Sequence, residues 1–239
     1  MEPNPQFISM LDPLVGVRST VGSCVPGGGA AVVERTADGG ATWTRVLVDV
    51  LDLRQVLSLD YVADGQISIV GTGADCMPIG LVSFTGGEFW EAGPDQLASA
   101  SFVEPNDPSK ILDRGAEMSA PCSVSELQRA GGTLIALCSD GSVQYRGTDA
   151  SWIPVGIGDV LVATASGETT LLTASLDPAC SGTLFRSVDL ATDRVADLAC
   201  ISVLPANATL DVAANSVIFW SGEEVYLSQN GGVTWAAVS

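Results

Sequence analysis

The stretch Thr36–Trp43 reads TADGGATW, and near the end of the chain it recurs at Ser228–Trp235 as SQNGGVTW. Both copies have Ser or Thr first, Asp or Asn two residues later, then Gly-Gly, and Trp at the eighth position. Short runs of apolar residues flank each copy, as at 31–34 and 44–48 around the first. Asp, Asn and Gly tolerate the positive φ of a tight turn, so each copy predicts a β-hairpin whose Trp folds back over the strands.

The two octapeptides resemble the Asp-box, or BNR, repeat. Proteins with this repeat include sialidases, sortilin-type receptor ectodomains, secreted glycoside hydrolases and photosystem assembly factors. In that family the box is a structural turn between the third and fourth strands of a β-propeller blade. The resemblance therefore implies a propeller, but it does not separate enzymes from receptors and scaffolds.

Three weaker copies of the pattern lie at Ser83–Trp90, Tyr145–Trp152 and Ser187–Arg194. The five copies start at residues 36, 83, 145, 187 and 228, so the steps between them are 47, 62, 42 and 41 residues. A four-stranded propeller blade takes about 40–45 residues. The spacing therefore predicts an all-β fold, a small β-propeller of five four-stranded blades. An open arc, or a sixth blade within 93–121, is the structural alternative.

In this interpretation one domain covers 1–239. Its blades lie at about 7–48, 56–92, 122–155, 160–200 and 209–238, with an insertion at about 93–121. The residues expected to build the turns are Thr36, Asp38, Gly40, Trp43, Ser83, Gly87, Trp90, Ser187, Asp189, Ser228, Asn230, Gly232 and Trp235.

Composition narrows the function. Lys and Arg number 10 against 28 Asp and Glu, a net charge of −18, and such a field disfavours binding to nucleic acid. No apolar run reaches the roughly 18 residues of a membrane span. The chain has no His, which excludes Ser-His-Asp triads and His-ligated metal sites. It also lacks an Asp-x-Asp-x-Asp-Gly calcium loop. We expect no cofactor and no metal site.

The six cysteines form no CxxC motif, which favours disulfides and an oxidising compartment. The blade model predicts the pairs Cys122–Cys138, Cys180–Cys200 and Cys24–Cys76, all on the face opposite the octapeptide turns. The first five residues are acidic and Pro-rich, unlike a signal peptide. We expect a secreted or cell-envelope protein whose signal sequence is not part of this sequence, and residue usage favours a bacterial source.

No catalytic constellation is predicted. Sialidases need an arginine cluster, a Tyr–Glu pair and an Arg-Ile-Pro, but the corresponding slot here is 17–19, VRS. Other glycosidases need two carboxylates across a cleft. Asp60, Asp107, Asp113 and Glu126 are candidates, but among 28 acidic residues such candidates are always found.

The preferred prediction is a non-catalytic binding or scaffold propeller for a protein, peptide or glycan. Resemblance to Asp-box proteins implies that the ligand binds on the face away from the boxes. Possible binding residues are Lys110 and Arg114, within 93–121, and Trp220, which is out of register with the turns. The alternative is a glycoside hydrolase of the Asp-box, sialidase-like superfamily. Arginines and carboxylates that converge in the central channel would favour the enzyme, and a shallow or plugged channel the binding protein.

Overall fold

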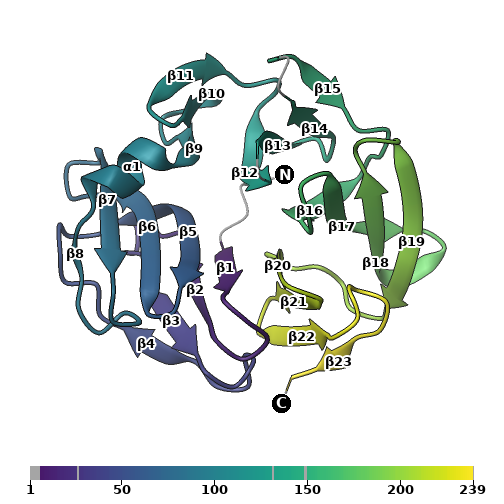
Figure 1. Cartoon of the computed structure of the whole chain (residues 1–239), viewed down its shortest axis with the longest axis horizontal. Helices are drawn as coiled ribbons and strands as arrows, with labels where there is room; N and C mark the ends of the chain where they lie inside the picture. Colours follow the sequence, from purple (N-terminus) through teal and green to yellow (C-terminus); the bar gives the residue numbers. More distant parts are fainter. Residues whose placement is uncertain (1–5, 26, 131, 148–149, 239) are drawn as a thin grey trace.

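A computed structural model of the protein describes residues 6–25, 27–130, 132–147 and 150–238, which form six antiparallel sheets in a ring (Figure 1). Five sheets have four strands and one has three. In each four-stranded sheet the order in the chain is also the order in space, with the first strand nearest the centre of the ring and the fourth at its rim. The fold is an all-β propeller.

Each sheet is one continuous stretch of chain. The four-stranded sheets are β1 (Gln6–Met10), β2 (Gly16–Thr20), β3 (Val33–Thr36) and β4 (Thr44–Val46); β5 (Gln55–Ala63), β6 (Gln66–Thr72), β7 (Pro78–Ser83) and β8 (Glu91–Ala92); β12 (Val124–Ala130), β13 (Thr133–Cys138), β14 (Val143–Arg146) and β15 (Trp152–Pro154); β16 (Val160–Ala165), β17 (Thr170–Asp177), β18 (Cys180–Asp189) and β19 (Arg194–Ile201); and β20 (Thr209–Ala213), β21 (Ser216–Ser221), β22 (Glu224–Ser228) and β23 (Ala236–Ala237). The three-stranded sheet is β9 (Ser101–Glu104), β10 (Asp107–Asp113) and β11 (Ala116–Ser119), and helix α1 (Pro94–Ser99) precedes it.

The expectation of five blades was wrong, because the segment 93–121 is a blade of its own and not an insertion. Its innermost strand is β9, with β10 and β11 following outward, and α1 packs against β7 of the second blade. This blade has no Gly-Gly-Trp turn, so a search by that pattern passes over it. The 62-residue step between the second and third copies contains this blade, which explains its length.

The repeated turns are closed by hydrogen bonds within eight residues. Thr36 Oγ1 accepts a hydrogen bond from Gly40 N at 2.9 Å, and Asp38 Oδ1 accepts one from Thr42 N at 2.8 Å. Gly40 has a φ of +93°, which favours glycine. In the last sheet Ser228 Oγ and Asn230 Oδ1 accept the equivalent hydrogen bonds, both at 2.9 Å.

The weaker copies differ from this turn to different degrees. In the second, Ser83 Oγ accepts from Gly87 N at 2.9 Å, and the hydroxyl of Thr85 replaces the Asp side chain. The fourth copy is a different turn, in which Asp189 Oδ1 accepts from Ala191 N at 2.9 Å. In the third copy, residues 148–149 lie outside the described residues.

Each of the three well-formed turns packs against the blade before it in the ring. The Cα of Gly87 faces Val46 of the first blade, and that of Gly232 faces Leu172 of the fifth. The turn of the first blade packs in the same way on the last blade, where Gly40 faces Val225. Blade one therefore contacts blade six and closes the ring, with no strand shared between them.

An arginine between two tryptophan rings strengthens this closure. The guanidinium carbon of Arg18 lies 4.3 Å from the ring centroid of Trp43 and 4.3 Å from that of Trp220. Its Nη2 also forms a 2.7 Å ion pair with Glu34 Oε2. Cation–π contact with two rings favours a fixed geometry at the junction of the first and last blades.

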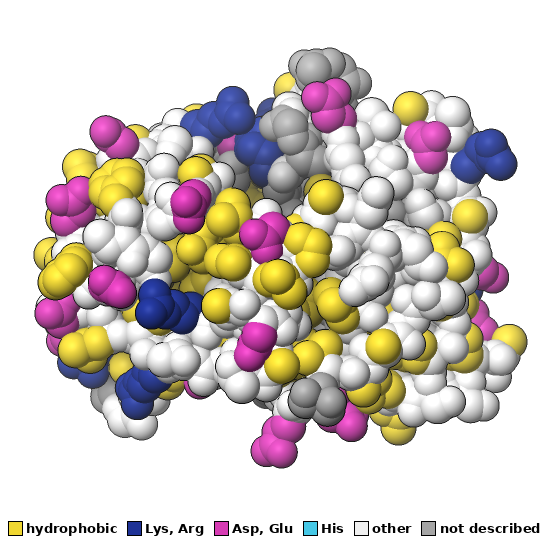
Figure 2. Space-filling view, turned by 60° about the horizontal axis from the view of Figure 1, so that its bottom comes forward, with side chains coloured by type: hydrophobic (Ala, Val, Ile, Leu, Met, Phe, Trp, Pro, Cys, Tyr) yellow, Lys and Arg dark blue, Asp and Glu magenta, His cyan; other side chains and the backbone are white. Residues whose placement is uncertain are grey.

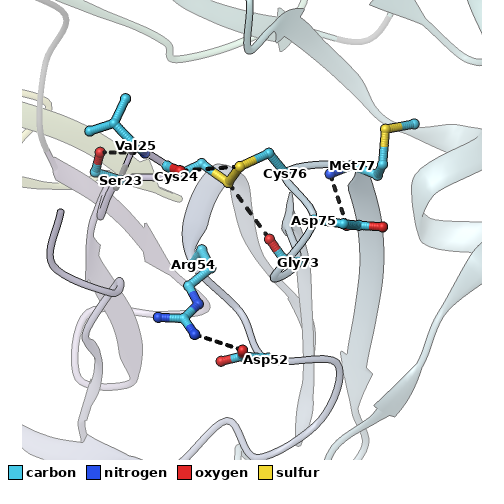
Figure 3. Close-up of a disulfide and its surroundings, with 9 residues drawn as sticks. All are labelled: Ser23, Cys24, Val25, Asp52, Arg54, Gly73, Asp75, Cys76 and Met77. Atoms are coloured by element: carbon cyan, nitrogen blue, oxygen red, sulfur yellow. Dashed lines mark hydrogen bonds and ion pairs between the residues drawn. A yellow bond between two sulfur atoms is a disulfide. The ribbon is translucent and has the colours of Figure 1, made fainter. Parts of the chain in front are cut away.

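Three disulfides lie at the strand ends opposite the repeated turns, and they join the expected pairs. Cys24–Cys76 links the first two blades, with the Arg54–Asp52 ion pair nearby (Figure 3). Cys122–Cys138 and Cys180–Cys200 each close one sheet. Three disulfides are typical of an extracellular or otherwise oxidising environment. None of the helices in the described ranges combines the length and apolar character needed to cross a membrane.

Candidate functional site

A cavity of about 490 Å³ lies at the centre of the ring, where the innermost strands face one another. All six blades line it, through β1, β5, β9, β12, β16 and β20. Side chains alternate along a strand. In β1, for example, Ile8 and Met10 are buried in the core between sheets, while Phe7 and Ser9 are only partly buried and Ser9 lines the cavity. Polar and apolar side chains from the innermost strands of all six blades therefore line one space.

Three carboxylates from three blades line this cavity: Asp60 on β5, Glu126 on β12 and Asp211 on β20. Among the described lining residues Arg129 alone is basic. Its guanidinium is already engaged, since Nη2 forms an ion pair with Asp113 and Nε donates to Ser101 Oγ at 3.1 Å. The lining therefore carries an excess of negative charge when its carboxyls are ionised.

Some lining side chains also satisfy the backbone of the neighbouring blade. The first strands of neighbouring blades do not pair with one another in a sheet. Backbone N–H groups on their inner edges therefore need other hydrogen-bond acceptors. Asp211 Oδ2 accepts from Met10 N at 2.6 Å, and Ser9 Oγ accepts from Tyr61 N at 2.9 Å. Gln128 Oε1 accepts from Ala165 N at 3.2 Å. Two of these three acceptors are neutral, so the capping task does not require a charge.

The enclosing protein changes how these groups titrate. Burial raises the pKa of Glu126 to about 7, although a hydrogen bond from Gln128 and an interaction with the backbone of Ala163 act to lower it. Burial also raises the pKa of Asp211 to about 6, and nearby Asp60 adds to the effect. The Asp60 side chain is open to the cavity, but burial among the surrounding residues still raises its pKa, although a hydrogen bond from Ser58 acts to lower it.

Asp113 behaves in the opposite way. Its burial raises the pKa, but hydrogen bonds from Ser101 and Arg129 outweigh that effect and hold the pKa below its ordinary value. Asp113 and Arg129 therefore form a charged pair at the wall, with the side chain of Arg129 directed to its partner and not to an open ligand position. In the described ranges, Asp, Glu and Cys side chains form no group of three or more able to hold a metal ion.

The carboxylates considered from the sequence separate in the structure. Asp60 and Glu126 reach the cavity, and Asp113 lies beside it as the partner of Arg129. Asp107 is elsewhere and caps its own turn, where it accepts from Ser109 N at 3.1 Å. Sequence reasoning missed Asp211. An available signal was an acidic residue inside a predicted first strand, which the segments of Asp60, Glu126 and Asp211 share.

The three residues considered for binding do not meet. Lys110 is exposed on β10 and forms a 2.9 Å ion pair with Glu117, and Arg114 is exposed in the following turn. Trp220 belongs to the last blade and is only 6% exposed. Its Nε1 donates to Gly222 O at 2.8 Å. Expecting Trp220 to face a ligand was wrong, because the ring is buried against Arg18 at the closure of the propeller.

No family model and no curated protein matches the chain. Among solved structures, "YCF48 bound to D1 peptide" is similar with a TM-score of 0.51 and 20% identity, over 97% of this chain and 79% of that one. YCF48 from Cyanidioschyzon merolae gives 0.38 and 16%, over 96% and 68%. The GH74 xyloglucanase from Xanthomonas campestris gives 0.37 and 13%, over 99% and 38%. The likeness to peptide-bound YCF48 shows the fold: the chain is a β-propeller.

Proposed function

We propose that this protein is a non-catalytic binding propeller that takes a polypeptide segment of a partner into its central cavity. The observation that carries the proposal is the cavity itself, at about 490 Å³ and lined by all six blades. Sites of about 300–1,000 Å³ suit a small ligand or a few side chains. Serine, threonine and carboxyl oxygens in the lining offer hydrogen-bond acceptors to such a segment.

Two further observations support this reading. YCF48, a propeller of similar fold, is described with a bound peptide. Cys122–Cys138 ties the start of β12, a strand that lines the cavity, to the end of β13, and the other two disulfides hold the outer parts of the blades together. Such stapling favours a preformed site, which lowers the entropic cost of binding. Three disulfides also support a secreted or cell-envelope location for this function.

A glycoside hydrolase of the Asp-box superfamily is the second candidate. The observation that favours it is the convergence of three carboxylates, one of which, Glu126, has a pKa of about 7 and could hold a proton for a leaving group. Against it stands the single lining arginine, which is paired with Asp113. The enzyme was expected to bring several arginines, as well as carboxylates, together in the central channel.

Peptide selection tests the proposal. Random peptides displayed on phage are selected on the oxidised protein, and Ser58→Phe, which fills the cavity from β5, should abolish the enrichment. Thr169→Phe adds the same bulk at an exposed turn and should leave it intact. A panel of chromogenic glycosides is assayed in parallel. Absence of enriched peptides, or equal enrichment on both variants, would sink the proposal, and glycoside turnover would favour the second candidate.

A further inference from the structure

We infer that the central cavity selects a cationic side chain, lysine or arginine, from the polypeptide that enters it. This inference rests on the proposed function and names the chemistry of its ligand. Three features of the cavity carry it: unneutralised carboxylates, a buried carboxylate oxygen without a well-placed donor, and a wall that combines apolar and acidic surfaces.

The first feature is charge without a counter-charge. Asp60, Glu126 and Asp211 come from three different blades, and Arg129 is committed to Asp113 and Ser101. Accepting hydrogen bonds from the backbone of a neighbouring blade does not require this charge, because the neutral hydroxyl of Ser9 also accepts one. The exterior adds to the field, since the net charge is −18 and Figure 2 shows acidic side chains scattered over the visible side.

The second feature is a buried carboxylate oxygen that no donor reaches with good hydrogen-bond geometry. Glu126 Oε1 accepts from Gln128 Nε2 at 2.9 Å, but Oε2 is buried and no described donor reaches it with good hydrogen-bond geometry; the backbone of Ala163 only partly offsets the effect of burial on this carboxyl. Folded proteins leave few buried polar atoms unsatisfied, and an unpaired buried carboxylate is costly. A ligand ammonium or guanidinium would place compensating positive charge beside this group, which a neutral or acidic side chain cannot do.

The third feature is the mixed character of the wall. Phe7, Leu57 and Leu127 line the same cavity as the carboxylates. Lysine and arginine have apolar stems and charged heads, and they pack the stem on apolar surface while the head stays among polar groups. Asp60 is the carboxylate most open to the cavity and is the natural first contact for such a head group.

Two synthetic peptide mixtures provide the test. Both are blocked heptapeptides with six randomised positions, and the central residue is arginine in one and citrulline, its uncharged isostere, in the other. Binding to the oxidised protein is measured at pH 8 by affinity selection and mass spectrometry. Because hydrogen bonds to charged groups are stronger than neutral ones, we expect the arginine mixture to be retained about tenfold more strongly.

Variants of the protein test whether a preference for the arginine mixture arises in the cavity. The triple variant Asp60→Asn, Glu126→Gln and Asp211→Asn keeps acceptor oxygens and should remove the preference. A surface triple with the same change in net charge, Glu88→Gln, Glu168→Gln and Asp193→Asn, should retain it. If the cavity triple does not fold, Asp60→Asn alone should weaken the preference, because that carboxylate caps no backbone group of another blade in the described interactions.

The outcomes separate the two proposals. Equal retention of both mixtures would overturn the cationic selectivity and leave peptide binding standing. Retention of neither mixture would overturn both proposals. A preference that survives in the cavity variants would place the cation elsewhere on this acidic protein and would also overturn the inference.

Discussion

Replacing Glu126 by Gln should change how the stability of the protein depends on pH. The pKa of this carboxyl is about 7 in the folded protein and 4.5 ordinarily. Between these values the folded protein holds a proton that the unfolded chain has released. The stability that this proton confers is fully present below about pH 4.5 and is lost as the pH rises through about 7. The amide of the variant does not titrate, so the variant lacks this loss.

The size of the effect follows from the same two values. Each unit of difference in pKa between folded and unfolded states corresponds to about 1.4 kcal/mol, so the wild type should lose about 3 kcal/mol relative to the variant between pH 4.5 and 8. The carboxyl lines a cavity that solvent can reach, so this figure is an upper bound. For a chain of this size 1 kcal/mol corresponds to about 2–4 °C in Tm.

The assay is urea unfolding of both proteins, with disulfides intact, followed by tryptophan fluorescence at several pH values. Asp60, Asp211, Arg129 and Asp113 surround the same cavity, and they remain in both proteins, so the difference between the two isolates Glu126. Glu168→Gln, at an exposed turn, is the matched control and should follow the wild type. A constant difference in unfolding free energy between pH 4.5 and 8 would refute the reasoning, because it would mean that Glu126 titrates normally.

Three further predictions concern the fold. Arg18→Met should lower the unfolding free energy by about 2 kcal/mol in urea titrations, since it removes a cation between two rings and leaves Glu34 unpaired; an unchanged value would show that apolar packing alone closes the ring. Asp38→Ala should lower the Tm by about 3 °C, while Asp38→Asn should lower it little, because Asn230 closes the equivalent turn in the last blade. Serine in place of both Cys24 and Cys76 should cost about 4 kcal/mol, more than loss of either shorter-range disulfide, because this bond closes a loop of 52 residues; equal losses for all three would contradict the loop-entropy argument.

The propeller was predictable because its signal is local. Thr36 and Asp38 hold their turn through partners no more than four residues away, so the octapeptide carries that geometry wherever it occurs. The two disulfide pairs within single sheets also followed from strand register, since Cys122 and Cys138, for example, flank a hairpin whose strands pair along their length. Neither inference needed the number of blades to be correct.

The third blade had no such local signal. It lacks the turn, and its sheet is held by side chains such as Phe102 and Ile111, which are 2% and 0% exposed. Ile111 packs with Val124 and Ala136 of the next blade. Burial of this kind depends on neighbours that the sequence of the segment does not specify. A search by turn pattern therefore counted five blades and left this one as an insertion.

The octapeptides and the cysteine spacing were enough to establish a disulfide-stapled propeller, because turn chemistry and strand register act over a few residues. The cavity depends on the closed ring. Asp60 and Glu126 were two carboxylates among 28 acidic residues until six blades packed around one axis and brought them to face Asp211. The same closure buried Trp220, which the repeat register alone had left free for a ligand. Contacts between blades come from the packing of whole sheets, so the tertiary structure alone determines which side chains share the central space.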